Sequence, residues 1–230
     1  MNQQLALAIQ LNTEANLADF CWKGNSLLQE QLQQIITAQS EPLLCIWGVA
    51  GSGKSHLLQA CCVAAGPTQS AIYLPLAILK EWGPQVIDGI EEQTLICIDD
   101  IDAIAADPAW EEALFHLYNR VRDNNQTTLL VTSKQPPANM PIGLADLRSR
   151  LGWGLVIQVN ELSDDDKIAT LILHARKRGF DLPHSVGQFL LNRCARNMHD
   201  LHTLLNRLDQ ASLSAQRKIT IPFVKESLGL

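Results

Sequence analysis

The sequence predicts an α/β protein built on a parallel β-sheet, followed by a smaller segment made only of helices. Three observations support this prediction. Apolar strand-like stretches alternate with helix-like stretches between residues 43 and 160, a glycine-rich loop follows the first of them, and strand-like stretches stop after residue 160. Alternation of this kind is typical of right-handed crossovers between parallel strands. The 230 residues suffice for one such domain and a small second one.

The expected elements follow in order from the apolar pattern. Residues 25–39 form an amphipathic helix, because Leu28, Leu32 and Ile35 fall on one face. The predicted strands are 43–47, 71–74, 95–98, 127–132 and 154–159, and the predicted helices between them are 55–65, 76–82, 108–123 and 143–151. Asp107-Pro108 opens the third of these helices with a cap and a first-turn proline. Further helices at 163–179, 183–196, 199–215 and 222–228 complete the C-terminal segment, the first of them opened by Ser163 and ended by Gly179.

Composition excludes several classes of protein. The net charge is −6, with 16 acidic and 8 basic side chains in residues 1–160, which argues against a general nucleic-acid binder. No apolar run approaches the ~20 residues that span a bilayer, and the start of the chain lacks a secretory signal pattern. The six cysteines include no C-x-x-C pair, so we expect buried thiols in a reducing compartment rather than disulfides or a metal site.

The glycine-rich loop at residues 48–55 matches the phosphate-binding pattern G-x-x-x-x-G-K-[ST] in full. Its glycines allow backbone N–H groups to face a polyphosphate, Lys54 reaches the β- and γ-phosphates, and the Ser55 hydroxyl is a ligand for Mg²⁺. The predicted strand before the loop and helix after it are the context that this motif requires. The sequence therefore predicts a site for ATP or ADP with Mg²⁺. The candidate nucleotide-binding residues of this segment are Gly48, Gly51, Ser52, Gly53, Lys54, Ser55 and His56.

Polar residues at two later strand ends are expected to complete this site. Asp99 and Asp100 end an apolar strand, where the first acid anchors Mg²⁺ through water and the second orients the attacking water. Asp102 is interpreted as a solvated loop acid. Thr132 ends the next strand and is a candidate for the γ-phosphate or the attacking water, with a turn-capping role as the alternative.

Arg150 lies in the stretch Leu147-Arg148-Ser149-Arg150-Leu151-Gly152-Trp153-Gly154, at the expected end of a helix. A rigid cation in such a place suits an arginine finger, which stabilises charge on the γ-phosphate of a neighbouring subunit. A surface salt bridge is the alternative for an isolated arginine.

Residues 147–154 and the segment Ile98-Asp99-Asp100-Ile101 resemble the AAA+ domain of the DnaA family. The match is closer to the Hda branch of that family, through Trp110-Glu111, Phe115, Leu117-Tyr118-Asn119-Arg120, Pro136-Pro137, Arg178-Gly179-Phe180 and residues 215–226. The resemblance implies an AAA+ P-loop core with a five-stranded parallel sheet at 13–160 and a helical lid at 161–230. It also implies regulatory inactivation of DnaA, in which Arg150 acts in trans on ATP bound to the DnaA AAA+ domain. A DNA-binding domain of the DnaA type is not expected after Leu230, and sequence-specific DNA binding is not expected.

Residues 4–9 are similar to the peptides that dock on the DNA polymerase sliding clamp. The candidate clamp-binding residues in a flexible segment at 1–12 are Gln4, Leu5, Leu7 and Ile9, with Ala8 where that peptide usually has proline. An anchoring glutamine and apolar side chains entering a preformed pocket explain such docking. The resemblance thus implies a cytoplasmic protein that reaches the nucleoid through the clamp, and it allows a homo-oligomer.

Two residues depart from the DnaA pattern. Lys134 stands where an aspartate is usual, and His199 stands where the lid usually has an arginine that contacts the phosphates. A partly protonated imidazole replaces a permanent guanidinium poorly. We therefore expect weak ATP hydrolysis or none, and ADP as the natural ligand. Two alternatives remain open: a helicase loader of the DnaC/IstB type, and an adaptor between DnaA and the clamp whose nucleotide site is idle.

Overall fold

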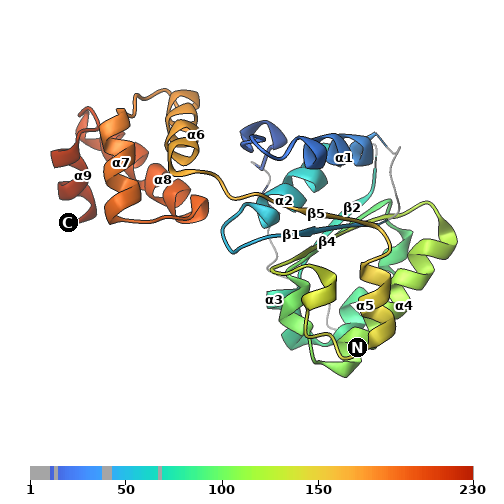
Figure 1. Cartoon of the computed structure of the whole chain (residues 1–230). Coiled ribbons are helices and arrows are strands. Elements are labelled where there is room, and N and C mark those ends of the chain that lie inside the picture. Colours follow the sequence, from blue (N-terminus) through green and yellow to red (C-terminus); the bar gives the residue numbers. More distant parts are fainter. Residues whose placement is uncertain (1–10, 13–14, 38–42, 67–68, 230) are drawn as a thin grey trace, which may run out of the picture. The chain divides into compact units, whose positions relative to one another are not determined.

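The computed structural model describes residues 11–12, 15–37, 43–66 and 69–229, and it contains the predicted α/β architecture followed by helices (Figure 1). The strands are β1 (Leu43–Trp47), β2 (Ala71–Pro75), β3 (Leu95–Asp99), β4 (Thr128–Ser133) and β5 (Leu155–Gln158). The α-helices are α1 (Ser26–Ile36), α2 (Lys54–Ala65), α3 (Leu76–Leu79), α4 (Pro108–Asn124), α5 (Ala145–Leu151), α6 (Asp164–Lys177), α7 (His184–Arg193), α8 (Met198–Ala215) and α9 (Ile221–Leu228). Short 3₁₀ segments occupy parts of the connections. The prediction of a parallel five-stranded sheet is confirmed.

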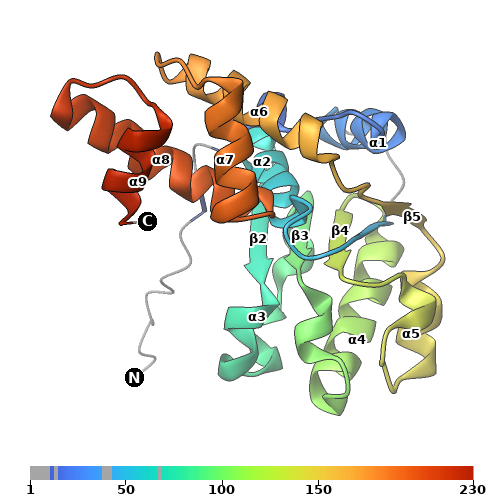
Figure 2. The ribbon, with the colours of Figure 1, turned by 60° about the vertical axis from the view of Figure 1, so that its left-hand side comes forward.

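The sheet has the strand order β2-β3-β4-β1-β5, and all of its pairs are parallel. Figure 2 shows the neighbouring strands β2, β3 and β4 in this order. Because β1 lies beside β4 and not beside β2, the chain crosses over β3 and β4 after the first strand. Trp47 of β1 pairs with Ser133 of β4. The carboxyl ends of these strands therefore meet at one edge, where open α/β sheets bind ligands.

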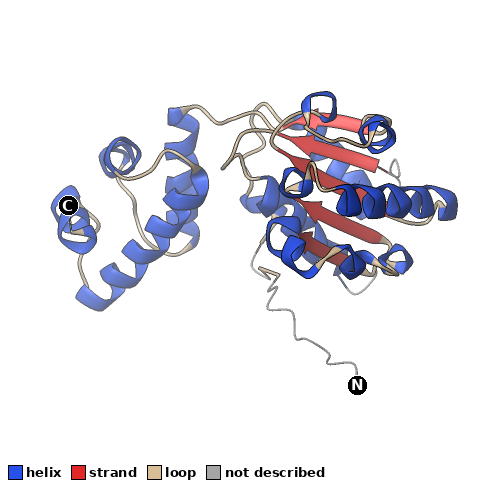
Figure 3. Ribbon diagram, turned by 90° about the horizontal axis from the view of Figure 1, so that it is seen from below, coloured by secondary structure: helices blue, strands red, loops and turns tan. Residues whose placement is uncertain are grey.

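Helices cover both faces of this sheet (Figures 1 and 3). Helices α1 and α2 lie on one face, while α3, α4 and α5 lie on the other. The strands β1 and β3 are buried almost completely, as expected for strands covered on both sides. Trp110 of α4 is 1% exposed and anchors the second face in a core that includes Leu117, Val131 and Leu151.

The predicted helix caps are confirmed. The Asp107 carboxylate accepts hydrogen bonds from the backbone N–H groups of Ala109 and Trp110, at the start of α4. The Ser163 hydroxyl accepts from the N–H of Asp166 at the start of α6. Gly179, with φ of 86°, follows the end of the same helix. These local contacts satisfy N–H groups that have no partner within the helix.

The chain forms two compact units. The α/β unit ends at Val159, and the helical unit consists of Cys21–Gly24, Val49–Gly53 and the chain from Asn160 onward. Helices α6 to α9 pack around their own apolar core, which includes Ile168, Leu190, Leu205 and Phe223. Within the described ranges, every helix is too short or too polar to span a lipid bilayer.

Candidate functional site

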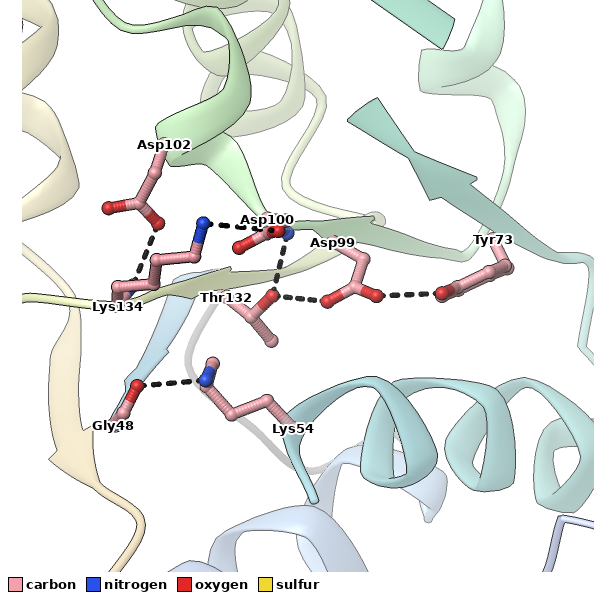
Figure 4. A network of polar contacts seen from close by, with 8 residues as sticks. All are labelled: Gly48, Lys54, Tyr73, Asp99, Asp100, Asp102, Thr132 and Lys134. Carbon is pink, nitrogen blue, oxygen red and sulfur yellow. Dashed lines mark hydrogen bonds and ion pairs between the residues drawn. The ribbon is translucent and has the colours of Figure 1, made fainter. Parts of the chain in front are cut away.

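The phosphate loop follows β1, and α2 begins at its lysine. Gly51 and Gly53 have φ of 78° and 96°, a conformation that residues with a side chain rarely adopt. Lys54 is only 7% exposed, and its Nζ donates a 2.8 Å hydrogen bond to the carbonyl of Gly48 (Figure 4). Burial lowers the pKa of Lys54, although the carboxylates of Asp100 and Asp99 oppose this shift. An anion bound beside this ammonium would favour its charged form.

Three further residues of the loop segment differ in their surroundings. The Ser52 hydroxyl is buried and has no hydrogen-bond partner among the described residues. Ser55 is exposed, and its predicted role as a ligand for Mg²⁺ stays a prediction. His56 lies with its Nε2 at 3.1 Å from the carbonyl oxygen of Asn16, and its ring stacks on Phe20 with centroids 6.5 Å apart. The predicted contact of His56 with a nucleotide stays a prediction.

Asp99 is held by hydroxyl groups from two sides. It is 6% exposed, and its Oδ2 accepts a 2.7 Å hydrogen bond from the hydroxyl of Tyr73 on β2. Its Oδ1 accepts from the Oγ1 of Thr132 on β4, at 2.5 Å (Figure 4). Burial and the neighbouring Asp99 raise the pKa of Tyr73 above its usual range, so Tyr73 stays a donor. Each carboxylate oxygen keeps a lone pair, so Asp99 can still accept a hydrogen bond from a water bound to Mg²⁺.

Thr132 therefore orients the acids of β3. Besides its bond to Asp99, its Oγ1 accepts a 2.8 Å hydrogen bond from the backbone N–H of Asp100. The predicted alternatives for Thr132 were a phosphate contact or a turn cap. In the structure the hydroxyl bridges β4 to the end of β3, because the register of these parallel strands places both side chains at the same edge. A contact of Thr132 with the γ-phosphate or the attacking water stays a prediction.

Asp100 and the two residues beside it form a charged group at the same edge. Asp100 has φ of 61°, a left-handed conformation that is costly for a residue with a side chain. Its carboxylate lies 3.7 Å from the Nζ of Lys134. Asp102, which was interpreted as a solvated loop acid, lies on the 3₁₀ segment Ile101–Ile104. Asp102 is half-buried, and its Oδ2 accepts a 2.7 Å hydrogen bond from the backbone N–H of Lys134, because the turn after β4 passes directly over it.

Arg150 lies in the last turn of α5 and is held by aromatic rings. Its guanidinium carbon is 4.3 Å from the ring centroid of Trp153 and 5.9 Å from that of Tyr118 on α4. The Nη1 atom is buried without a hydrogen-bond partner, and Arg150 forms no ion pair with a described residue. Arg148 is exposed, and it donates a 3.4 Å hydrogen bond to the carbonyl of Ile142. The predicted alternative of a surface salt bridge for Arg150 thus finds no partner in the described part of the chain.

The structure brings most of the predicted nucleotide-site residues of the α/β unit together at one edge of the sheet, as Figure 4 shows for Gly48, Lys54, Asp99, Asp100 and Thr132. His199 is an exposed residue in the first turn of α8, in the helical unit. Gln4, Leu5, Leu7 and Ile9 lie outside the described residues. The sequence interpretation missed Tyr73, although a phenol inside the apolar strand 71–75 was a signal that could have indicated it.

Comparisons with known protein families match two parts of the chain. Residues 77–158 match the family described as the bacterial DnaA ATPase domain. Residues 164–228 match the family described as the lid domain of Hda. The first match covers β3 to β5 with Asp99, Thr132 and Arg150, and the second covers all four helices of the C-terminal segment.

Solved structures of similar fold include initiators and a motor protein. Domain III of the replication initiation protein DnaA from Thermotoga maritima has a TM-score of 0.78 and 19% identity, over 96% of this chain and 98% of that one. AMPPCP-bound DnaA from Aquifex aeolicus has a TM-score of 0.69 and 20% identity, over 86% and 67%. The RuvB Holliday junction branch migration motor of Thermotoga maritima has a TM-score of 0.70 and 15% identity, over 96% and 73%. At these identities the likeness concerns the fold.

Proposed function

We propose, from the premise that this chain belongs to the DnaA family of AAA+ proteins and carries a lid domain of the Hda type, that it promotes hydrolysis of the ATP bound to DnaA. In this proposal the chain acts together with the DNA-loaded sliding clamp. The product is inactive ADP–DnaA, so the chain is a negative regulator of chromosomal replication initiation. It works in the cytoplasm and reaches the nucleoid through the clamp.

The observation that carries this proposal is that the Arg150 guanidinium contacts aromatic rings and no carboxylate of the described residues. A surface arginine usually has a carboxylate partner or is extended into water, whereas this guanidinium rests on aromatic rings and has no ion pair with a described residue. Its charge is therefore not neutralised by a carboxylate of the described residues, and the N–H donors other than those of the buried Nη1 atom are available to an anion. In the AAA+ mechanism that we propose, that anion is the γ-phosphate on a DnaA neighbour. An arginine that stabilises the transition state of phosphoryl transfer contributes roughly 10³–10⁵ in rate.

The chain's own phosphate loop serves a different purpose in this proposal. Backbone N–H groups of the loop and Lys54 bind the phosphates of ADP or ATP, as the AMPPCP-bound DnaA relative suggests. Ser55 and Asp99 hold Mg²⁺, the latter through water, and the ion neutralises phosphate charge. Asp100 is the residue that would orient a water, but the ammonium of Lys134 lies 3.7 Å from its carboxylate. In this ion pair the ammonium competes with a water for the carboxylate of Asp100, so the chain binds nucleotide and turns it over slowly.

The N-terminal segment supplies the contact with the clamp. Gln4, Leu5, Leu7 and Ile9 enter the apolar pocket of the clamp in this proposal, and the AAA+ surface then meets DnaA on the same DNA. His199 in the lid contributes to nucleotide sensing, and the bound nucleotide controls self-association of the chain. The proposal for this segment rests on the sequence pattern of residues 4–9.

The decisive experiment measures hydrolysis of radiolabelled ATP bound to DnaA, with clamp loaded on DNA, as the chain is added. The variants are Arg150→Ala, a Gln4→Ala/Leu7→Ala double variant, and Arg148→Ala as the matched control. Arg148 is also an α5 arginine, and it contacts a carbonyl of its own unit. We expect Arg150→Ala to lose at least 100-fold in rate. The Gln4→Ala/Leu7→Ala double variant should lose stimulation only in reactions in which hydrolysis depends on the DNA-loaded clamp. Arg148→Ala should stay within about threefold of the wild-type rate.

Three outcomes would each contradict a part of the proposal. Full stimulation by both Arg150→Ala and the double variant would remove its basis, and full stimulation by Arg150→Ala alone would favour a clamp–DnaA adaptor. Steady ATP turnover by the purified chain without partners, abolished in Lys54→Ala, would refute the inference that its own site is nearly idle.

A further inference from the structure

Trp153 is an unusual residue for the surface of a small α/β unit. Its side chain is 65% exposed, although indole is among the largest apolar groups that folding can bury. It therefore contributes little to the core of its unit. What it does contact is the guanidinium of Arg150, whose central carbon lies 4.3 Å from the indole centroid. Tyr118, which is 8% exposed on α4, faces the same guanidinium at 5.9 Å. We call these two rings the aromatic cradle.

The turn after α5 constrains the backbone that carries the indole. The N–H of Trp153 donates a 3.0 Å hydrogen bond to the carbonyl of Arg150, so the two residues share one turn. Gly154 then passes so close to β1 that an added Cβ would lie 2.3 Å from the carbonyl oxygen of Leu43. A side chain at residue 154 would therefore push the turn away from the sheet. The cradle is thus built on backbone that has little freedom to move.

An aromatic ring holds a cation in a way that a carboxylate does not. A carboxylate partner would orient Arg150, but it would also neutralise the charge and occupy the N–H donors. A ring face attracts the guanidinium through its quadrupole while the donors, which lie in the guanidinium plane, stay free. In agreement with this arrangement, Arg150 forms no ion pair with a described residue. Its Nη1 atom is buried, so the N–H donors that stay free are those of the other guanidinium nitrogens.

We propose that Trp153, supported by Tyr118, is a positioning residue that holds Arg150 ready for the phosphate of a partner's nucleotide. This inference rests on the proposed function, since it concerns how Arg150 is made ready for that role. The cradle limits the rotamers of a long side chain before the partner arrives. The partner's phosphate oxygens then meet a charged group that is already in place, so less ordering remains to be done in the transition state.

The test separates positioning from docking. Hydrolysis of DnaA-bound ATP is measured against chain concentration, which yields a maximal rate and a half-maximal concentration. Trp153→Leu removes the ring face and keeps an apolar side chain, whereas Trp153→Phe keeps a ring. We expect Trp153→Leu to lower the maximal rate about tenfold without changing the half-maximal concentration, and Trp153→Phe to stay within about threefold of the wild type. Trp82→Leu, at a tryptophan that is 37% exposed on a 3₁₀ segment, is the control and should match the wild type.

A second readout follows the cradle directly in the isolated chain. In proton NMR spectra, the ring current of the indole should shift the δ-methylene signals of Arg150 upfield. This shift should disappear in Trp153→Leu, persist in reduced form in Trp153→Phe and stay unchanged in Trp82→Leu. A Trp153→Leu/Arg150→Ala double variant should be no slower than Arg150→Ala alone, because both changes remove the same contribution.

The outcomes distinguish this inference from the function on which it rests. If Arg150→Ala loses stimulation but Trp153→Leu keeps the wild-type maximal rate, the positioning role is wrong and the proposed function stands. If Trp153→Leu raises only the half-maximal concentration, Trp153 is a docking residue and the inference is likewise overturned. If Arg150→Ala keeps full stimulation, the proposed function fails and the inference fails with it.

Discussion

Glu111 offers the sharpest test of how the α/β unit holds the helix that carries Arg150. This side chain of α4 is 2% exposed, and its carboxylate accepts three backbone hydrogen bonds. Oε1 accepts from the N–H groups of Ala106 at 2.8 Å and Gly143 at 3.1 Å, and Oε2 accepts from that of Leu144 at 2.7 Å. Leu144 is the N-cap residue of α5. One carboxylate thus ties the loop before α4 to the start of α5.

The expected loss in the free energy of unfolding follows from the three backbone N–H donors that Glu111→Ala would leave without an acceptor. An unsatisfied buried donor costs ~1–3 kcal/mol. Water can reach part of this group, because Glu111, Gly143 and Leu144 line an open cavity of about 640 Å³. We therefore expect a loss of ~3–4 kcal/mol in the free energy of unfolding, at the lower end of the ~3–9 kcal/mol that three unsatisfied donors would give. Glu111→Gln keeps one carbonyl oxygen but turns an N–H₂ group toward one donor, so it should cost ~1–2 kcal/mol.

The assay is urea unfolding followed by tryptophan fluorescence, because four of the five tryptophans belong to the α/β unit. Glu112→Ala is the matched control: this neighbour is exposed and has one contact, at 3.7 Å, with His116. It should change the free energy of unfolding by less than ~0.5 kcal/mol. If Glu111→Ala were no more destabilising than Glu112→Ala, the carboxylate would not be holding the two loops together.

Three further predictions concern the nucleotide site and the thiols. Lys134→Ala should free Asp100 from its ion pair and raise the chain's own rate of ATP hydrolysis roughly tenfold. The rate is measured as phosphate release. An unchanged rate would mean that the ion pair does not limit turnover. Tyr73→Phe should cost ~1–2 kcal/mol in urea unfolding. Since the folded pKa of Tyr73 is raised above its ordinary 10.0, the stabilisation by its hydroxyl is complete below pH 10 and is lost above it, so Tyr73→Phe should flatten the alkaline loss of stability. With an aromatic disulfide reagent at pH 8, Cys21 and Cys194 should react first because they are half-buried, while the other four thiols are buried; six fast thiols would contradict this packing.

Much of the α/β order could be predicted from local sequence. Three kinds of local signal depend only on contacts among residues close in the chain: apolar runs of five residues, the Asp107-Pro108 cap and the phosphate loop. The predicted strand 43–47 accordingly coincides with β1, and the other four predictions differ from β2 to β5 by one residue at one or both ends. The helix at 76–82 was predicted as one element, but α3 ends at Leu79 and residues 80–82 form a 3₁₀ turn. Gly83, with φ of 81°, ends this segment.

Long-range pairings could not be predicted in the same way. Tyr73 and Asp99 are 26 residues apart, and Asp99 and Thr132 are 33 apart. They meet only because β3 lies between β2 and β4 in register, which depends on the packing of the whole sheet. In the sequence, Glu111 resembles any acidic residue on the polar face of a helix. In the structure it is buried against a loop that lies 32 residues further along the chain. Periodicity along one helix carries no information about what packs over it.

By itself the sequence determined that this chain has a phosphate loop on a parallel sheet, acids at the end of a neighbouring strand, an arginine at the end of a helix, and helices after residue 160. These features depend on local hydrogen bonding and on side-chain periodicity, both of which are present in any short window of the chain. Only the tertiary structure decided that Tyr73 and Thr132 hold Asp99, that Lys134 pairs with Asp100, and that Arg150 rests on Trp153 and Tyr118. Apart from the contact of Arg150 with Trp153, which share one turn, these contacts depend on strand order and on the close packing of elements far apart in the chain, and a shift of register by one residue would separate the pairs that join neighbouring strands.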